Sequence, residues 1–282
     1  MLFISFSVSF IEIFFYYFSE KFGLVNSLYV LLKGKSHPLD LFSSTNQKGT
    51  VYGFLSVTWG LLSDVDIESE RYRFLGPLRF TIGAIQRIAS LRHYRGTLYY
   101  LPAVEKPLNS EVGIEQLGDS PTTSDDPELH KDREPKNTDN IELLSKGEMS
   151  GPKCSIPSLL EPCGEEWKKI EDEFILLGIQ SISHLGSDMH SAPGALFDDG
   201  HLDVQFIKKG TTKKTMMNLL VAFETGKHLE SDDVTQLKVR AYRLVPGGEQ
   251  PGHIAVDGEE IEYGTVQGEI LPSLANIMML KK

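Results

Sequence analysis

The second half of the sequence alternates short apolar runs with turn residues, and this pattern constrains the fold more than any other feature. Gly, Pro and Asp separate five such runs, EFILLGIQSI, GHLDVQFIKKG, LKVRAYRLVP, GHIAVDGEEIEYG and TVQGEILP. Runs of this kind predict antiparallel strands. The segment TKKTMMNLLVAFETGKH instead carries a helical apolar stripe, Met216, Leu219, Leu220 and Phe223, closed by Gly226. We therefore expect a mainly β fold with a few helices, as a sandwich or a curved sheet over a helix.

The first half adds two predicted helices and two predicted strands. Apolar residues recur at helical spacing from Leu24 to about Leu41 and then break at Gly34 and Pro38, which predicts a helix followed by a connection. TVYGFLSVTWGLLSDVDI predicts a strand buried on both faces, and GTLYYLPA predicts a second strand. RFTIGAIQRIASLRHYRG predicts a basic amphipathic helix that ends at Gly96, with Arg92, His93 and Arg95 in its last turn. Its apolar stripe is Phe80, Ala84, Ile88 and Leu91.

Composition divides the chain into four parts, namely 1–23, 24–103, 104–165 and 166–282. Residues 104–165 hold 14 Asp or Glu against 6 Lys or Arg and are rich in Ser, Thr, Pro and Gly, which predicts a disordered acidic insert between strands. The first eighteen residues are apolar except for Glu12 and fit neither a membrane span nor a signal peptide cleanly. A weak membrane anchor, a buried strand and an unnatural start all stay open for this segment.

The charge and the cysteines exclude some classes of function. The net charge of −11 argues against nucleic-acid binding, because neutralising phosphates takes a surplus of Lys and Arg on one face. Cys154 and Cys163 lie nine residues apart with no nearby histidine ligands, so we read them as reduced thiols and expect no metal site.

Charged residues concentrate in SDVDIESERYRFLGPLRF, directly after an apolar run. If the strand continues through Asp66, alternation puts Asp64 and Asp66 on one face, where two carboxylates can hold an ammonium group or share a proton. Arg73 and Arg79 lie on the two sides of a Gly-Pro turn and could converge on one anion. The alternative is a solvated turn, with local ion pairs that contribute roughly 0 to 1 kcal/mol each.

A second candidate site is the turn in VDGEEIEYG. Asp-Gly between two β-runs is the favoured two-residue hairpin loop, although a carboxylate beside a close-approach glycine can also meet a nucleotide. The sequence contains no GxxxxGK[ST], GxGxxG or GGDG phosphate loop.

Three stretches together resemble the C-terminal half of the sphingosine kinases, which are lipid kinases related to diacylglycerol kinases. They are the run from FLSVTWGLLSDVDI to GTLYYLPA, the run SHLGSDMHSAPGALFDDGHLDV, and VDGEEIEYGTVQG. The resemblance covers about Leu24 to Pro272 without the insert, and HPLDLFS, SDVDI and VDGEEIEYG are more similar to the type 2 isoform than to type 1.

The resemblance implies an antiparallel β domain that encloses the lipid, with ATP and Mg²⁺ as cofactors. It implies that Asp66 binds the sphingosine head group and that Arg73 and Arg79 bind ATP phosphate. It also implies that Asp257, Gly258 and Glu259 lie at the nucleotide. The acyl-chain pocket would be lined by Leu62, Val65, Phe80, Leu219, Leu220 and Phe223.

The residues before about Leu24 do not resemble this family, so we expect its nucleotide-binding domain, with the glycine loops and the general-base aspartate, to be missing. We therefore expect a sphingosine kinase, acting on sphingosine or sphinganine, whose form here has negligible transfer activity. The alternative is a non-catalytic module that binds a membrane surface or a calmodulin-like protein through residues 80–96. Either would be cytoplasmic and peripherally membrane-associated.

Overall fold

Antiparallel strands make up most of the chain described by the computed structural model, which covers residues 24–76, 78–103, 155–186, 189–248 and 252–280. The expectations for residues 1–23 and for most of the acidic insert lie outside these residues. In sheet order the strands run β2-β1-β10-β7-β4-β5-β3-β8-β9, and β6 pairs with β5 and β7. Their bounds are β1 Lys35–Asn46, β2 Gly49–Gly53, β3 Ser56–Gly60, β4 Tyr94–Pro102, β5 Lys168–Gln180, β6 Leu202–Lys208, β7 Val234–Pro246, β8 Ile254–Val256, β9 Glu259–Ile261 and β10 Val266–Met279. The predicted mainly β, antiparallel fold is confirmed.

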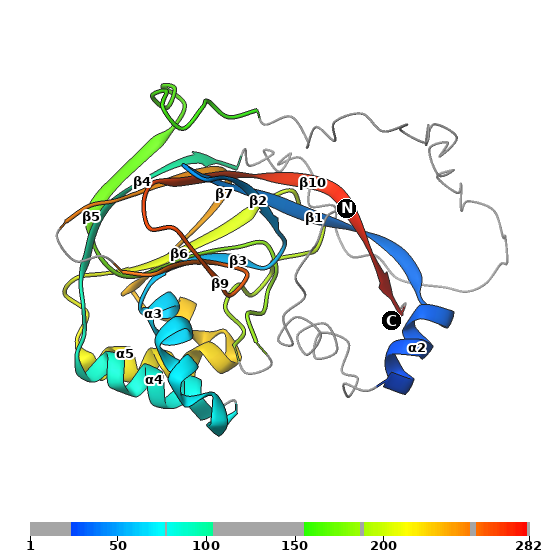
Figure 1. Cartoon of the computed structure of the whole chain (residues 1–282), viewed down its shortest axis with the longest axis horizontal. Coiled ribbons are helices and arrows are strands. Elements are labelled where there is room, and N and C mark those ends of the chain that lie inside the picture. Colours follow the sequence, from blue (N-terminus) through cyan, green and yellow to red (C-terminus); the bar gives the residue numbers. More distant parts are fainter. Residues whose placement is uncertain (1–23, 77, 104–154, 187–188, 249–251, 281–282) are drawn as a thin grey trace, which may run out of the picture. The chain divides into compact units, whose positions relative to one another are not determined.

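Two long strands curl the sheet into a sandwich-like form. One half of β5 pairs with β4 and the other half with β6, and β7 divides its pairing between the same two strands. The four strands therefore enclose a core of aromatic and aliphatic side chains, including Trp59, Tyr94, Phe174, Phe206 and Tyr242. Figure 1 shows this curvature, with the helices below the sheet.

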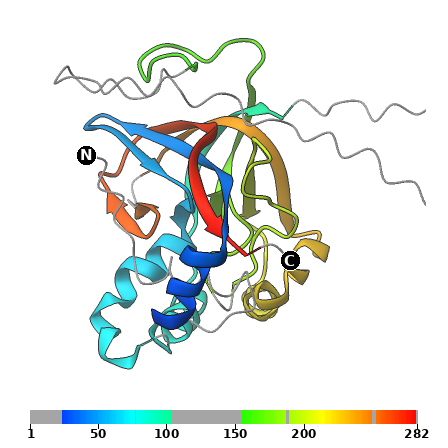
Figure 2. The same ribbon diagram turned by 90° about the vertical axis from the view of Figure 1, so that its right-hand side faces the viewer.

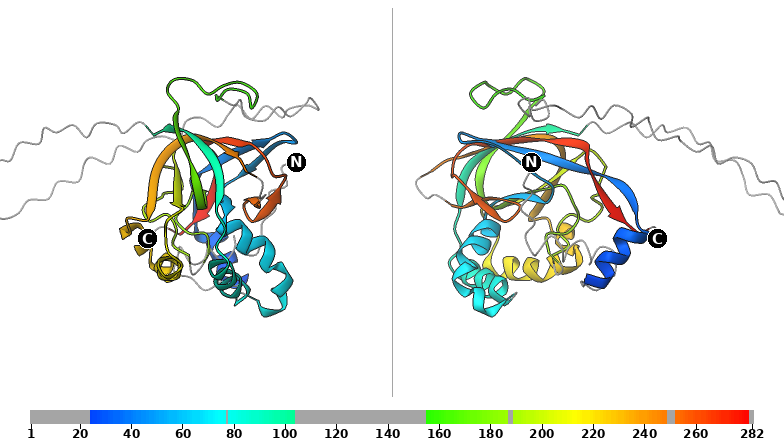
Figure 3. Two further views of the ribbon diagram at one scale, coloured as in Figure 1. Left: turned by 90° about the vertical axis from the view of Figure 1, so that its left-hand side faces the viewer. Right: turned by 45° about the vertical axis from the view of Figure 1, so that its right-hand side comes forward.

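The helices α3, α4 and α5 lie on one side of the sheet, as the two views in Figure 3 show. Their bounds are α3 Leu61–Glu68, α4 Leu78–Ala89 and α5 Lys213–Ala222, with the 3₁₀ segments η1 Ser69–Leu75, η2 Phe223–Thr225 and η3 Lys227–Glu230. A second apolar cluster fills the space between these helices and strands β5 and β6, with Leu61, Ile88, Ile175, Ile207 and Leu219 among its buried members. The described part of the molecule thus has separate apolar layers inside the sheet and beneath it.

The predicted strand TVYGFLSVTWGLLSDVDI is two strands and a helix, so this prediction is wrong. The chain turns at Gly60, whose φ of 81° is costly for a residue with a side chain, and α3 begins at Leu61. Strand β3 is buried as expected, whereas β2 is mostly exposed. Asp64 and Asp66 consequently lie on a helix and not on one face of a strand.

Two other boundaries also differ from the prediction. The first helix, α2 Leu24–Lys33, lies at one end of the β1–β10 pair (Figure 2), and the residues after Gly34 form β1 in place of a connection. Pro38 fits that strand because this part of β1 pairs with β10 alone among the described strands, which leaves an edge where no N–H is needed. Helix α4 ends at Ala89, so Arg92 precedes β4 and Arg95 lies on it.

The helix predicted around Leu219 is confirmed as α5. The Thr212 side chain accepts a hydrogen bond from the Thr215 backbone N–H and caps its start. Gly226, at φ 75°, follows the short η2 turn that continues the helix. Within the described part of the chain, the helices are all too short or too polar to cross a bilayer.

Candidate functional site

Helix α3 carries two aspartates that point to different surroundings. Residues two apart on an α-helix do not face each other, so the turn into α3 separates Asp64 from Asp66. Asp64 is buried under α4 and β4, with 1% of its surface exposed, whereas Asp66 is partly open to solvent. The shared face that alternation predicted for the pair does not exist.

Asp66 lies among charged residues from η1, α4 and the β8–β9 hairpin. Its Oδ1 is 3.9 Å from Nη2 of Arg79, and a Cβ on Gly258 would lie 3.5 Å from its Oδ2. Burial raises the pKa of Asp66 to about 6; Arg79 acts to lower it, and Glu70 and Glu259 act to raise it. The structure therefore brings together four of the predicted site residues, Asp66, Arg79, Gly258 and Glu259.

The two predicted phosphate-binding arginines differ in solvent exposure and in their ion pairs. The Arg79 side chain is 14% exposed and pairs with both Glu70 and Asp66. The Arg73 side chain is 82% exposed, and its Nη1 lies 3.5 Å from Glu70 Oε2. Both guanidinium groups thus contact Glu70, and Arg73 is the more accessible of the two to an incoming anion.

Asp257 has a clear role within the fold. Its carboxylate accepts backbone hydrogen bonds from Phe54, Leu55 and Ser56, at 3.0, 3.0 and 2.9 Å. Asp257 and Gly258, at φ 51° and 83°, form the left-handed turn between β8 and β9. Nucleotide contact by Asp257 stays a prediction, and its side chain is already used to hold the connection between β2 and β3.

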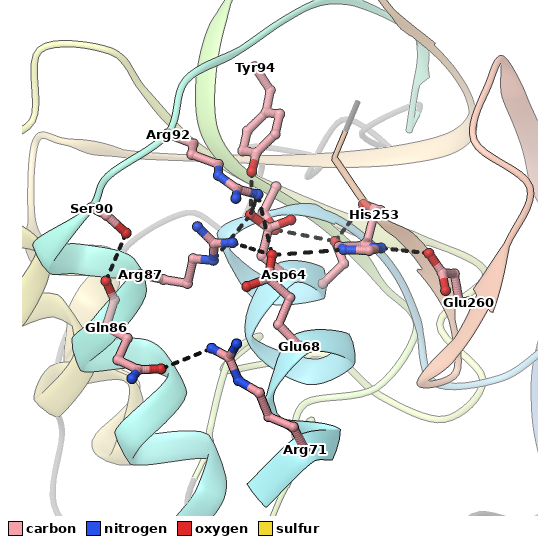
Figure 4. A network of polar contacts seen from close by, with 12 residues as sticks. Asp64, Glu68, Arg71, Gln86, Arg87, Ser90, Arg92, Tyr94, His253 and Glu260 are labelled. Carbon is pink, nitrogen blue, oxygen red and sulfur yellow. Dashed lines mark hydrogen bonds and ion pairs between the residues drawn. The ribbon is translucent and has the colours of Figure 1, made fainter. Parts of the chain in front are cut away.

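Asp64 is the centre of a buried polar network that the sequence patterns did not predict (Figure 4). Its Oδ2 accepts a hydrogen bond from Tyr94 Oη and lies 3.7 Å from Arg87 Nε and 3.5 Å from Arg92 Nη1. Burial and the Asp64 charge both raise the pKa of Tyr94, which therefore stays a neutral donor. Two guanidinium groups and a phenol compensate this carboxylate, while its Oδ1 has no partner among the described residues.

Glu68, one turn after Asp64, extends the network toward the hairpin. Arg87 Nη2 donates to Glu68 Oε1, and Arg92 Nη1 lies 3.3 Å from the same oxygen. His253 Nε2 lies 3.9 Å from it and His253 Nδ1 lies 2.5 Å from Glu260 Oε1. Asp64, Glu68 and His253 offer ligand atoms within 4.8 Å of one another, as a cation site requires. The two arginines already supply positive charge there, so we interpret the group as an ion-pair network.

A cleft of about 510 Å³ opens beside this network between α3, η1 and α4. Its lining includes Asp64, Glu68, Arg71, Arg87 and Arg92, together with the polar groups of Tyr72, Gln86 and Ser90. Of the predicted acyl-pocket residues only Val65 is part of that lining. Charged and polar side chains thus form much of the cleft, which meets the predicted lipid pocket at Val65.

Most predicted acyl-pocket residues lie together in the apolar layer beneath the sheet. Leu62, Val65, Leu219 and Leu220 all belong to that cluster, which α3 and α5 place against β5 and β6. Phe223 is buried and stacks on His228 with ring centroids 3.9 Å apart, whereas Phe80 lies under the Arg79 guanidinium, 4.3 Å away. The cluster thus begins directly beside Asp66, on the same helix.

One signal in the sequence could have indicated the Asp64 network. Arg87 lies within the helix whose apolar stripe includes Ala84 and Ile88, and Arg92 follows the end of that helix, so Arg87 borders its buried face. The strand predicted through Asp66 gives Asp64 no position on a helix facing these arginines, so the network does not follow from that prediction. His253 carries no sequence signal of its own, because its contacts come from elements far apart in the chain.

The strand order and the two apolar layers define an antiparallel, β-sandwich-like domain. Residues 168–279 match the family model described as the YegS C-terminal NAD kinase beta sandwich-like domain. A solved structure of a diacylglycerol kinase from Bacillus anthracis str. Sterne is similar with a TM-score of 0.42 and 11% identity, over 86% of this chain and 53% of that one.

Among proteins of known function, the chain is similar to sphingosine kinases. It is 29% identical to human sphingosine kinase 2 over 344 residues, which cover 90% of this chain and 52% of that protein. It is 32% identical to mouse sphingosine kinase 1 over 254 residues, covering 89% and 58%. The chain thus spans between half and three fifths of these relatives. The similarity supports the sphingosine kinase family of lipid kinases, and the expected closeness to type 2 stays a prediction because the two identities are alike.

Proposed function

We propose that this chain provides the sphingoid-base binding side of a sphingosine kinase. The observation that carries the proposal is the position of Asp66, a partly buried carboxylate on α3 next to the apolar cluster of Leu62, Val65 and Leu219. A single-chain lipid with a cationic head requires such an arrangement, with the amine at the carboxylate and the chain along the apolar side chains. The sphingosine kinase relatives support the same substrate.

The phosphate side of the reaction belongs to this proposal as well. ATP with Mg²⁺ would supply the phosphoryl group. The exposed Arg73 fits an ATP phosphate, and Arg79 would have to exchange its contact with Glu70. Gly258 and Glu259 would border the nucleotide beside Asp66. Asp257 would act indirectly, by keeping the hairpin tip in place.

Binding of two lipids tests this function. Sphingosine carries a cationic amine, whereas its N-acetyl derivative is neutral at that position. We expect the chain to bind sphingosine at least tenfold more tightly, and Asp66→Asn to abolish that preference, because an amide has no charge to pair with the ammonium. Asp232→Asn, at an exposed aspartate outside the candidate site, is the matched control. Equal affinity of the unmodified chain for both lipids would contradict the proposal.

Phosphoryl transfer is a separate measurement on the same chain. Positioning and charge stabilisation dominate this reaction, and the 282 residues contain no glycine-rich phosphate loop. We propose that the purified chain binds the lipid but transfers radiolabelled phosphate from ATP at a negligible rate. Turnover equal to that of a full-length sphingosine kinase would overturn this part of the proposal.

A peripheral contact with a membrane is the second candidate function, and it rests on exposed apolar side chains of η1 and α4. Phe74 is 81% exposed, Leu78 56% and Ile85 46%. Arg87 and Arg92, in contrast, turn inward to Asp64 and Glu68, so a membrane or a calmodulin-like protein would meet the apolar side chains first. Co-sedimentation with lipid vesicles should fall for Phe74→Asp and Ile85→Asp, and unchanged binding would exclude this contact.

A further inference from the structure

We propose that His253 fastens the β8–β9 hairpin to α3 and is thereby a positioning residue for Asp66. The inference rests on the proposed role of Asp66 in binding an amine. It assigns to His253 the task of setting how closely the hairpin tip approaches that carboxylate. His253 lies directly before β8, outside every stretch to which the sequence patterns gave a function.

The hairpin meets α3 at both ends of the helix. Ser63 Oγ in the first turn donates to the His253 carbonyl oxygen at 2.8 Å. Glu68 at the end of the helix faces His253 Nε2, and Glu260 on β9 contacts His253 Nδ1 (Figure 4). One residue thus joins α3 and both strands of the hairpin, and Asp66 lies on α3 between Ser63 and Glu68.

The side chain of His253 makes contacts that its backbone cannot make. The Ser63 contact uses a backbone carbonyl, which every residue type provides. The contacts with Glu68 and Glu260 use the two ring nitrogens of one side chain, which lie on opposite sides of the imidazole. Substitution at 253 therefore removes the carboxylate contacts and leaves the Ser63 contact in place.

The hairpin has few other restraints along its outer strand. Strands β8 and β9 have three residues each, and β9 pairs with β8 alone among the described strands. β9 is largely exposed, whereas β8 is buried against β3. Glu260 is in the middle of β9, so its contact with His253 ties the weakly held strand back to α3.

Loss of the His253 contacts would affect Asp66 through the residues of the hairpin that lie next to it. Gly258 lies beside the Asp66 carboxylate, and the negative charge of Glu259 acts on the same group. Asp257 still holds the turn itself, so loss of the His253–Glu260 contact would release β9, and displacement of Glu259 would weaken the field that an ammonium experiences at Asp66. Release of the hairpin should therefore reduce recognition of the amine and leave contacts with the alkyl chain unchanged.

The test compares sphingosine with N-acetylsphingosine in the full 282-residue chain. For His253→Leu we expect the preference for the amine to fall about fivefold, as for the loss of one ion pair, with the affinity for N-acetylsphingosine unchanged. His253→Gln keeps a donor and should lose less. His93→Gln, at an exposed histidine before β4, is the control and should keep the full preference. Equal losses for both lipids in His253→Leu would overturn the proposal.

Hydrogen exchange of the unliganded chain separates this inference from the proposed function. We expect the amides of residues 254–261 to exchange at least tenfold faster in His253→Leu, with β4 and β5 unchanged. Unchanged exchange in the hairpin would refute the attachment of the hairpin to α3 by His253, even if Asp66 binds the amine. If the hairpin exchanges faster in His253→Leu but the chain shows no preference for the amine, the role of His253 is supported and the proposed lipid site is refuted.

Discussion

At the residue scale, Asp64 and Asp66 show how two positions on one helix set the chemistry of a carboxylate. Tyr94, Arg87 and Arg92 surround Asp64, so its buried charge is compensated within the fold. Asp66 has a single arginine at 3.9 Å and two acidic neighbours that oppose its ionisation. The fold leaves Asp66 short of positive charge, and a cationic ligand can supply it.

The pKa of Asp66 predicts how amine binding depends on pH. A cation binds the ionised carboxylate, and burial has raised this pKa from 3.8 to about 6. Affinity for sphingosine should therefore be constant above pH 7 and fall toward tenfold per pH unit below about pH 6. Titration calorimetry from pH 5 to pH 8 measures this. The Asp66→Asn variant should show no such change, and a wild-type profile without a step would contradict the assignment.

The same shift fixes the sign of the effect on stability. The folded chain binds the Asp66 proton more tightly than the unfolded chain does. The contribution of this group is fully present below pH 4 and is lost as the pH rises through about 6. A bound amine lowers the pKa, so ligand binding should release a proton near pH 6 and stabilise the fold most above that value.

At the element scale, the β8–β9 turn organises a segment some two hundred positions earlier in the chain. The Asp257 carboxylate accepts hydrogen bonds from the backbone N–H groups of Phe54, Leu55 and Ser56, where the chain passes from β2 into β3. Burial raises the pKa of Asp257, and these three bonds oppose that rise. The turn therefore serves stability in addition to any contact with a nucleotide.

Substitution of Asp257 should separate these roles. Asp257→Ala leaves three backbone donors unpaired, and we expect a loss of roughly 2 to 4 kcal/mol in the free energy of unfolding. Asp257→Asn keeps one acceptor oxygen and a side chain that tolerates φ 51°, so about 1 to 2 kcal/mol is expected. Urea unfolding measures both. Glu259→Gln, at the exposed neighbouring position, should change stability little, and an equal loss there would argue against the bonding role.

The sequence predicted most elements because their signals are local. β4, the later strands and α5 follow from alternation, turn residues and a helical stripe within each segment. The prediction for α3 was wrong because an apolar run that follows a strand indicates more strand, whereas the positive φ of Gly60 ends the strand there. The contacts of Asp64 with Arg92 and of His253 with Glu68 depend on that turn and on long-range pairing, which periodicity does not encode.

At the scale of the whole described chain, two apolar layers have different consequences for a lipid. The layer inside the curled sheet includes Leu98 and is enclosed by strands. The layer beneath it includes Leu219 and is covered by helices α3, α4 and α5 (Figure 3), and Val65, which packs against this layer, directly precedes Asp66. Helices can separate from a sheet without breaking its strand ladder, so we expect an alkyl chain to enter the lower layer.

Cavity-creating substitutions distinguish the two layers. Leu219→Ala and Leu98→Ala both remove a buried isobutyl group, and each should lower the free energy of unfolding by about 2 to 5 kcal/mol. Sphingosine should restore part of that loss in Leu219→Ala, because its chain can fill the vacated volume, as apolar ligands fill engineered cavities. Thermal unfolding with and without the lipid should show a larger upward shift of Tm for Leu219→Ala than for the unmodified chain. Leu98→Ala should show no such excess, and equal shifts in the two variants would place the alkyl chain elsewhere.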